Sequence, residues 1–339
     1  MTKENILFIG GVRHAKAQEA ALAAKYNIHY AALTRKELFE QLETAKREGI
    51  TFKALYRGFA SHYTLGRVDE PLLSALPTGL ELIGSVGAGY DFVDAEAATR
   101  NHQWVTNTPR VVDDATADAT ILLLLSTLRH QYEVEYNMRH GLPNKPRIGR
   151  DPTGMILGIV GMGGIGKAVA KRAQALGMNV VYYNRRPISF NEEDDEAASL
   201  KEVKYLPTLD ALLTTSDVVS IHVPLSAETR HLIRAEQFQK MKSGAYFLNT
   251  SRGPVVDEEA LVQALESGHI AGAGLDVFEH EPKVHPKLLK NMNVALMPHL
   301  GAFTIETITK MEALTMKNID LFLSSGSLLT PVNNIPQAL

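Results

Sequence analysis

The chain has 339 residues, more than one hydrophobic core usually supports, so we expect two domains. Its 35 Lys and Arg against 38 Asp and Glu give a formal charge of -3, which offers no basic excess for a run of phosphates and disfavours nucleic acid as a partner. It contains no cysteine, which excludes disulfides, thiolate catalysis and zinc-thiolate sites. A small metabolite is the expected partner.

The apolar runs of the chain are short. The N-terminal stretch MTKENILFIGG has too short an apolar run for a signal peptide. The run ILLLLSTL at 121–128 is well below the roughly 20 residues that a membrane span needs. We therefore expect no membrane contact and a cytoplasmic location.

Strand-like runs alternate with helix-like stretches through the first hundred residues, which is typical of βαβ units and a parallel sheet. The pattern predicts a strand at 5–10, helices at 14–26 and 35–49, and strand ends that open into loops at 52–58, 80–89 and 104–109. A long helix is expected at 114–141, with acidic residues at its start and cationic residues near its end, as the helix dipole favours. This helix would cross between domains.

A second alternating series follows a loop rich in Pro and Gly. The predicted strands of this series are 155–160, 179–184, 217–224, 244–251, 271–278 and 293–300. A last helix, about 303–324, has no strand after it and could return to the first domain. The expected fold is α/β, with two Rossmann-like or flavodoxin-like domains, parallel sheets and an interdomain cleft; one domain takes 1–110 with 304–339 and the other takes 111–303.

The stretch GMGGIGKA at 161–168 fits two kinds of phosphate site. A P-loop would predict magnesium-dependent ATP binding, but it needs Ser or Thr directly after Lys167, and that position holds Ala168. A strand before the stretch and a helix after it favour a dinucleotide turn instead.

The dinucleotide hypothesis assigns each glycine a task. Gly161 makes the tight turn, Gly163 lets the pyrophosphate approach the backbone, and Gly166 lets the helix pack on the strand. The amides of the helix N-terminus, at Gly164 and Ile165, would face the phosphates.

The residues after the next strand predict which dinucleotide binds. An NAD site places an acidic residue there, whereas this chain has Asn184, Arg185 and Arg186. Asn tolerates a 2'-phosphate and a guanidinium can bind it, so NADP(H) is favoured over NAD(H). Two ordinary surface arginines are the alternative.

Three further loops follow strands of the second series and carry Arg252, Asp276 with Glu281, and His299. Because the carboxyl ends of parallel strands face one crevice, these loops are expected to converge beside the nicotinamide. Taken singly, each of these residues could instead have a structural role, as a buried His, a turn cap or an ion-pair partner.

Together with GMGGIG and the stretch SVGAGYDFVD, these motifs resemble the D-isomer-specific 2-hydroxyacid dehydrogenase family from about residue 52 to residue 304. The resemblance implies that Arg252, Glu281 and His299 are the catalytic triad. Within the family, the sequence is similar to NADPH-dependent glyoxylate/hydroxypyruvate reductases and D-mandelate dehydrogenases. Formate dehydrogenases share the fold but pair Gln with His, so Glu281 argues against that branch.

The resemblance also implies the remaining site residues. Domain 1–110 with 304–339 would bind the substrate, and domain 111–303 the dinucleotide. Amides around Val86 and Gly87 would hold the substrate carboxylate opposite Arg252, and Tyr56 could face the cleft, although a buried Tyr is an equal alternative. The further residues expected at the cofactor are Thr116, Pro224, Asp276 and Gly301.

These residue types suit the reduction of a 2-keto acid to a D-2-hydroxy acid. The ketone oxygen gains negative charge as hydride arrives and needs a proton, which His299 can supply near neutral pH. Glu281 would favour the imidazolium, and Arg252 would orient the substrate carboxylate and polarise the carbonyl. In the oxidative direction His299 becomes the base.

Two expectations concern partners. A rival function is a dinucleotide-sensing corepressor or scaffold of the same fold, for which the sequence offers no basic tail. The apolar run 121–128 favours a homodimer, with burial inside one chain as the alternative.

Overall fold

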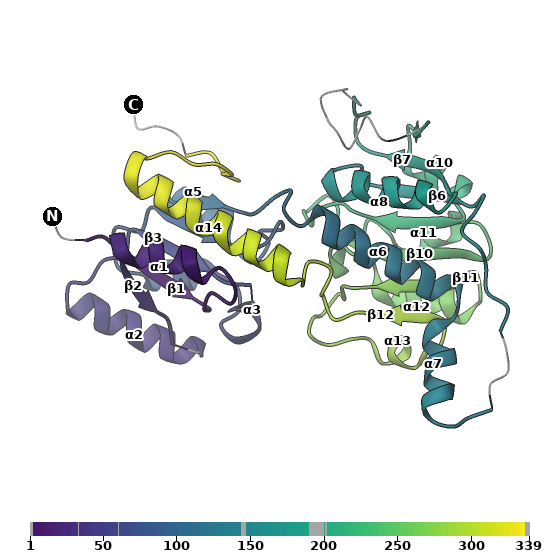
Figure 1. The fold of residues 1–339 in the computed structure, drawn as a ribbon, viewed down its shortest axis with the longest axis horizontal. Helices are drawn as coiled ribbons and strands as arrows, with labels where there is room; N and C mark the ends of the chain where they lie inside the picture. The colour runs from purple at the N-terminus through teal and green to yellow at the C-terminus, as the bar shows by residue number, and fades with distance from the viewer. Residues whose placement is uncertain are drawn as a thin grey trace. The chain divides into compact units, whose positions relative to one another are not determined.

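The computed structural model describes residues 3–32, 34–59, 61–143, 147–189, 200 and 202–335. Its internal contacts divide the chain into two units, Met1–Val112 with Phe303–Leu339, and Asp113–Ala302 (Figure 1). Each unit is a parallel sheet covered by helices, which confirms the predicted fold class. None of the helices described is long and apolar enough to span a bilayer.

The sheet of the first unit has the strand order β2-β1-β3-β4-β5, with neighbouring strands parallel. This is the flavodoxin-like order. The strands are β1 (Asn5–Ile9), β2 (Asn27–Tyr30), β3 (Ala54–Arg57), β4 (Leu82–Ser85) and β5 (Trp104–Thr106). The central strands β1, β3 and β4 are buried on both faces, as parallel sheets require.

Helices cover both faces of this sheet. They are α1 (Lys16–Lys25), α2 (Arg35–Arg47), α3 (Ser61–Thr64), α4 (Glu70–Ala75), α5 (Ala95–Arg100) and α14 (Ile305–Ser325). Apolar residues of α2, α4 and α5 form one core cluster with the strands, while α14 packs on β3, β4 and α1. The last helix is therefore part of the first unit.

Helix α14 also holds the start of α1. The buried carboxylate of Glu312 accepts the main-chain N–H groups of Arg13, His14 and Ala15 at 2.7, 2.9 and 2.9 Å. These amides precede the first helical residue, Lys16, so Glu312 fixes the loop that leads into α1 up to its N-cap residue Ala15.

The sheet of the second unit has the order β12-β11-β10-β9-β6-β7-β8 and parallel neighbours. The order reverses between β6 and β9, which is the switch point of a dinucleotide-binding sheet. The strands are β6 (Ile156–Val160), β7 (Asn179–Tyr183), β8 (Lys204–Tyr205), β9 (Val218–Ile221), β10 (Ala245–Asn249), β11 (Ile270–Leu275) and β12 (Val294–Leu296).

Two core clusters lie on opposite faces of this sheet. Helices α6 and α8 pack together over one face, and α10, α11 and α12 cover the other. The bounds are α6 (Asp113–Leu128), α7 (Gln131–Arg139), α8 (Gly164–Ala175), α10 (Leu209–Thr215), α11 (Ala235–Lys240), α12 (Glu258–Glu266), α13 (Pro286–Lys290) and the 3-10 turn η1 (Gly253–Val255).

The helix predicted at 114–141 is two helices. The chain breaks between α6 and α7 at His130, whose φ is 51°, a left-handed conformation that ends a helix. Strands β2 and β8 are further elements that the apolar pattern did not indicate, since both are short edge strands.

Candidate active site

The turn between β6 and α8 has the geometry of a phosphate-binding loop. Gly161 has φ 102°, and a β-carbon on Gly166 would overlap the carbonyl oxygen of Gly161, so both positions exclude other side chains. Gly163, by contrast, faces open space, with no atom within 4 Å of an added β-carbon. Helix α8 has no side-chain cap and no acidic residue in its first turn. The amides at Gly164 and Ile165 therefore suit an anion approaching over Gly163.

Asn184 directly follows β7 and lies beside this turn. Its Oδ1 accepts the N–H of Met162 at 2.8 Å, which fixes the orientation of the side-chain amide. Arg185 and Arg186 follow and are exposed. The structure thus puts the two guanidinium groups next to a residue hydrogen-bonded to the glycine turn.

The loops that carry the predicted triad leave three neighbouring strands. Arg252 follows β10, Glu281 follows β11 and His299 follows β12. Main-chain bonds continue the sheet into these loops, from Asp276 N to Asn249 O at 3.0 Å and from His299 N to Asp276 O at 2.7 Å. Parallel pairing therefore brings together residues far apart in sequence.

His299 and Glu281 are in direct contact. The distance from His299 Nδ1 to Glu281 Oε2 is 2.8 Å, and their side chains are 16% and 18% exposed. Burial raises the pKa of the Glu281 carboxyl. The hydrogen bond and charge of His299, the Phe278 amide and the charge of Arg252 outweigh this effect, so the pKa lies below its usual value. Glu281 is therefore a carboxylate that orients the imidazole.

Asp276 holds the main chain around His299. Its two carboxylate oxygens accept the N–H groups of Leu300 and Gly301 at 2.7 and 2.8 Å. His299 itself has φ 56°, a strained conformation for a residue with a side chain, and these bonds restrain it. Burial raises the pKa of Asp276, although the two amides and His299 oppose the change.

Two residues that the sequence did not indicate position Arg252. Asn249 is buried, and its Nδ2 donates to the Arg252 carbonyl at 3.0 Å. Gly253 lies directly against the main chain of Phe278, where a β-carbon would overlap the carbonyl. The Arg252 loop can approach the Glu281 loop because residue 253 has no side chain. Arg252 Nη1 donates to the Ser251 carbonyl at 2.8 Å.

Glu279 and His280 directly precede Glu281 in the loop after β11. Glu279 forms a short hydrogen bond with His231, with 2.6 Å between Oε1 and Nε2. His280 is exposed. A period-based pattern could not find this pair, because the two residues are 48 positions apart.

The remaining residues predicted at the cofactor lie in the second unit. Thr116 is buried in α6, and its Cγ2 would be 3.4 Å from a β-carbon on Gly301. Pro224 is exposed after β9. His222, also after β9, is neutral because burial lowers its pKa to about 3, and its Nε2 lies 2.8 Å from Ser220 Oγ.

Tyr56 does not face a cleft, contrary to one of the two expectations for it. Its side chain has no exposed surface, and its ring stacks on Phe8 with 4.4 Å between centroids. Burial raises its pKa well above the usual value. Tyr56 is thus a core residue of the first unit, because β3 is covered on both faces, and its side chain presents no surface to a substrate.

The main-chain amides of Val86 and Gly87 also differ from the expectation, because both are already hydrogen-bonded. The N–H of Val86 donates to the Arg57 carbonyl at 2.9 Å, and the N–H of Gly87 donates to Thr108 Oγ1 at 2.9 Å. Both amides that were expected to bind the substrate carboxylate therefore have partners within the first unit. Gly87 does keep the predicted special conformation, with φ 133°.

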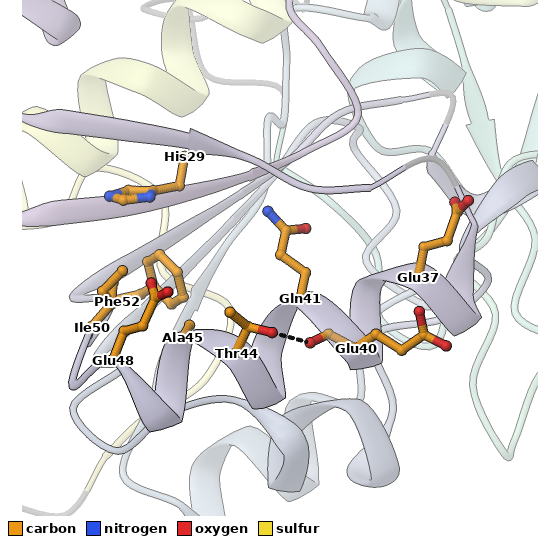
Figure 2. Close-up of a pocket in the computed structure, with 9 residues that line it drawn as sticks. All are labelled: His29, Glu37, Glu40, Gln41, Thr44, Ala45, Glu48, Ile50 and Phe52. Atoms are coloured by element: carbon orange, nitrogen blue, oxygen red, sulfur yellow. Dashed lines mark hydrogen bonds between the residues drawn. The ribbon is translucent and has the colours of Figure 1, made fainter.

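A hollow of about 450 Å³ lies elsewhere on the first unit, between β2 and α2 (Figure 2). Gln41 lies between the two elements, where its side chain donates to the Tyr30 carbonyl and accepts from the Ala32 amide. None of the predicted site residues lines it. Within the described ranges, no group of three or more His, Asp or Glu side chains is arranged to hold a metal ion.

Comparison with known proteins agrees with this geometry. Residues 121–301 match the family model for the NAD binding domain of D-isomer specific 2-hydroxyacid dehydrogenases. A 4-methyl-2-oxopentanoate reductase A from Aspergillus oryzae is 38% identical over 328 residues, covering 96% of this chain and 97% of the relative.

Two solved structures are similar over the whole chain. The crystal structure of a glyoxylate reductase from Paecilomyes thermophila has a TM-score of 0.89 and 40% identity, covering 98% of this chain and 99% of the other. An NADPH-dependent glyoxylate/hydroxypyruvate reductase from Sinorhizobium meliloti, in complex with NADP and malonate, has a TM-score of 0.82 and 32% identity and covers 100% of both chains.

Proposed function

Because the chain belongs to the D-isomer specific 2-hydroxyacid dehydrogenase family, and is therefore an oxidoreductase with a dinucleotide-binding unit, we propose that it reduces a 2-keto acid to a D-2-hydroxy acid with NADPH and catalyses the reverse reaction. The observation that carries the proposal is the 2.8 Å contact between His299 Nδ1 and Glu281 Oε2 at the ends of neighbouring strands.

Each triad residue has a role in this reaction. The bound cofactor supplies the hydride that reduces the keto carbon. His299 engages Glu281 through Nδ1, so we assign transfer of the proton to the ketone oxygen to Nε2. Glu281 stabilises the charged imidazole, and Arg252 binds the substrate carboxylate as a bidentate donor. In the oxidative direction His299 accepts the hydroxyl proton.

Three observations support a preference for NADP(H). The Met162 N–H holds Asn184 Oδ1, so the donor group Nδ2 is the part of Asn184 that remains for a ligand. Donors suit a phosphate, and a carboxylate at 184 would repel one. Arg185 and Arg186 are exposed beside it, and the structurally similar Sinorhizobium meliloti enzyme is NADPH-dependent.

We assign substrate binding to the first unit, without a contact from the buried Tyr56. Since the Val86 and Gly87 amides already have partners, the amides of Ala88 and Gly89 are the candidates in that loop for the carboxylate. For the remaining cofactor contacts we propose Thr116, Pro224, Asp276 and Gly301. In Asp276 and Gly301 this role would be added to the structural one described above.

We also propose a cytoplasmic homodimer. The α6–α7 segment and the chain after it expose large apolar side chains, which is typical of a subunit interface. These are Leu122, Tyr132, Met138, Leu142 and Ile148, with exposed fractions of 52, 42, 73, 47 and 95%. Light scattering at micromolar protein would then give twice the mass of one chain, and a purely monomeric sample would exclude the dimer.

The decisive experiment is a substrate panel with both cofactors. We expect NADPH oxidation with 2-ketoisocaproate, hydroxypyruvate or phenylglyoxylate, followed as loss of absorbance, and a higher kcat/KM with NADPH than with NADH. Binding of NADPH without turnover on any of the three acids would contradict the reductase assignment and favour a dinucleotide-sensing role.

A further inference from the structure

We propose that Glu279 and His231 form a positioning pair that holds the Arg252 loop and the Glu281 loop at a fixed separation. The inference rests on the proposed function, because it gives two residues outside the triad a role in the same reaction. It assigns them no contact with the substrate.

Both carboxylate oxygens of Glu279 are engaged. Oε1 lies 2.6 Å from His231 Nε2, and Oε2 accepts the N–H of Glu258 at 3.2 Å. The Glu279 side chain is only 14% exposed, so water competes little for these bonds. Burial raises the pKa of Glu279, but the hydrogen bonds from His231 and Glu258 and the charges of His231 and His280 lower it overall, so the group is a carboxylate. Its hydrogen bonds are therefore charge-assisted.

Glu258 returns the hydrogen bond to Glu279. Its Oε2 accepts the N–H of Glu279 at 2.9 Å, and its Oε1 accepts the N–H of His285 at 3.1 Å. Glu258 is the first residue of α12, which follows the η1 turn after Arg252. Two hydrogen bonds in opposite directions thus join the Arg252 segment to residue 279.

The segment around His231 is hydrogen-bonded to the loop that follows Arg252. The N–H of His231 donates to the Pro254 carbonyl at 2.9 Å, and the N–H of Ile233 donates to the Val255 carbonyl at 3.2 Å. Pro254 lies two residues after Arg252, and Glu279 lies two residues before Glu281. The Glu279–His231 pair therefore connects the two loops that carry Arg252 and Glu281, and Glu281 is the residue that holds His299.

Such a span matters because the reacting groups tolerate little displacement. A misplacement of about 1 Å lowers turnover by roughly 100-fold in well-organised sites. Gly253 permits the close approach of the two loops, and the Glu279–His231 pair supplies the attachment that keeps them together.

The test compares Glu279→Ala, Glu279→Gln and His231→Ala with Glu259→Gln. Glu259 is the matched control, since it lies beside Glu258 on α12 and its carboxylate is 3.2 Å from His285 Nε2, but it is 56% exposed and lies outside both loops. Glu279→Gln keeps an oxygen for the Glu258 amide and an amino group that can donate to a neutral His231. His231 is 41% exposed, so its removal leaves the core intact.

We expect Glu279→Ala and His231→Ala to lower kcat for the preferred keto acid by about 10- to 100-fold with less than a threefold change in the KM for NADPH. Glu279→Gln should recover to within about threefold of the wild type, and Glu259→Gln should match it. A kcat within twofold of the wild type in Glu279→Ala would overturn the proposal, as would equal losses in the Ala and Gln variants.

Hydrogen exchange separates this inference from the proposed function. If the wild type reduces no keto acid, the reductase assignment fails. Faster exchange of the amides of Gly253 and 255–258 in Glu279→Ala than in Glu259→Gln would still support the positioning role. Equal exchange in the two variants would overturn it.

Discussion

Gly253 and Phe278 touch through their main chains, so closely that a β-carbon on Gly253 would overlap the Phe278 carbonyl. This contact joins the loop of Arg252 to the loop of Glu281. Arg252 can approach the His299–Glu281 pair only because residue 253 lacks a side chain.

Gly253→Ala is therefore expected to move the Arg252 loop away from Glu281 and to lower kcat by about 10- to 100-fold. Steady-state kinetics with the preferred keto acid would measure the loss. Gly11→Ala is a suitable control, because Gly11 has no atom within 4 Å of an added β-carbon and is exposed. Equal activity of both variants would show that the loop contact is not needed.

His299→Ala should lower turnover by roughly 100-fold or more, the usual scale of lost general acid catalysis, while NADPH binding largely survives. Turnover and the Kd for NADPH, from cofactor fluorescence, would be measured on the same samples. His280→Ala, which changes an exposed histidine near Glu281, should leave turnover nearly unchanged. A comparable loss in both variants would argue against the assignment of His299.

Arg185→Ala combined with Arg186→Ala should weaken NADPH binding much more than NADH binding, because only NADPH carries the 2'-phosphate that exposed guanidinium groups can bind. NADH serves as the matched control ligand. Equal losses of affinity for NADPH and NADH would contradict the phosphate-binding role of these arginines.

How far the sequence predicted this site depends on how local each signal is. The glycine turn and the contact between His299 and Glu281 could be predicted because each motif directly follows a strand, and parallel strands bring their carboxyl ends together. Tyr56 and the Val86 and Gly87 amides were misassigned, since their surroundings depend on Phe8, Arg57 and Thr108, which no local pattern reveals.

The break in the predicted long helix has a similar cause. One left-handed residue, His130, interrupts an otherwise continuous helical pattern. Histidine adopts that conformation more often than most residues, but the chain has 12 histidines and the sequence does not show which of them does so. Asn249, Gly253 and Glu279 were missed because each acts on a neighbouring loop rather than on its own segment.

Glu312→Gln should destabilise the first unit. The buried carboxylate accepts three main-chain N–H groups, and an amide would turn a donor toward at least one of them. We expect a loss of about 3 kcal/mol in the free energy of unfolding. Chemical denaturation would measure it, with the exposed Glu306→Gln as control at about 1 kcal/mol or less. Similar losses of stability in the two variants would show that Glu312 does not hold the loop before α1.

Asp217 gives a stability difference that depends on pH. Burial raises its pKa, but Lys242 at 2.8 Å and the Ile156 amide at 2.8 Å lower it below the usual 3.8. A depressed carboxyl stabilises the fold above its unfolded pKa and loses that contribution as pH falls through the folded value. Thermal unfolding should therefore show Asp217→Asn less stable than the wild type at pH 6, with the gap narrowing below about pH 3.8. A gap independent of pH would contradict this.

The strand order of the second unit separates the residues proposed to select the coenzyme from those proposed to transfer the proton. Asn184 and the arginines follow β7, whereas Glu281 follows β11, four strand spacings or roughly 19 Å across the same sheet. Substitutions at such a distance usually combine additively in free energy. An evolving lineage can therefore exchange one pyridine nucleotide for the other without having to rebuild its acid, and the two traits can be inherited or engineered independently.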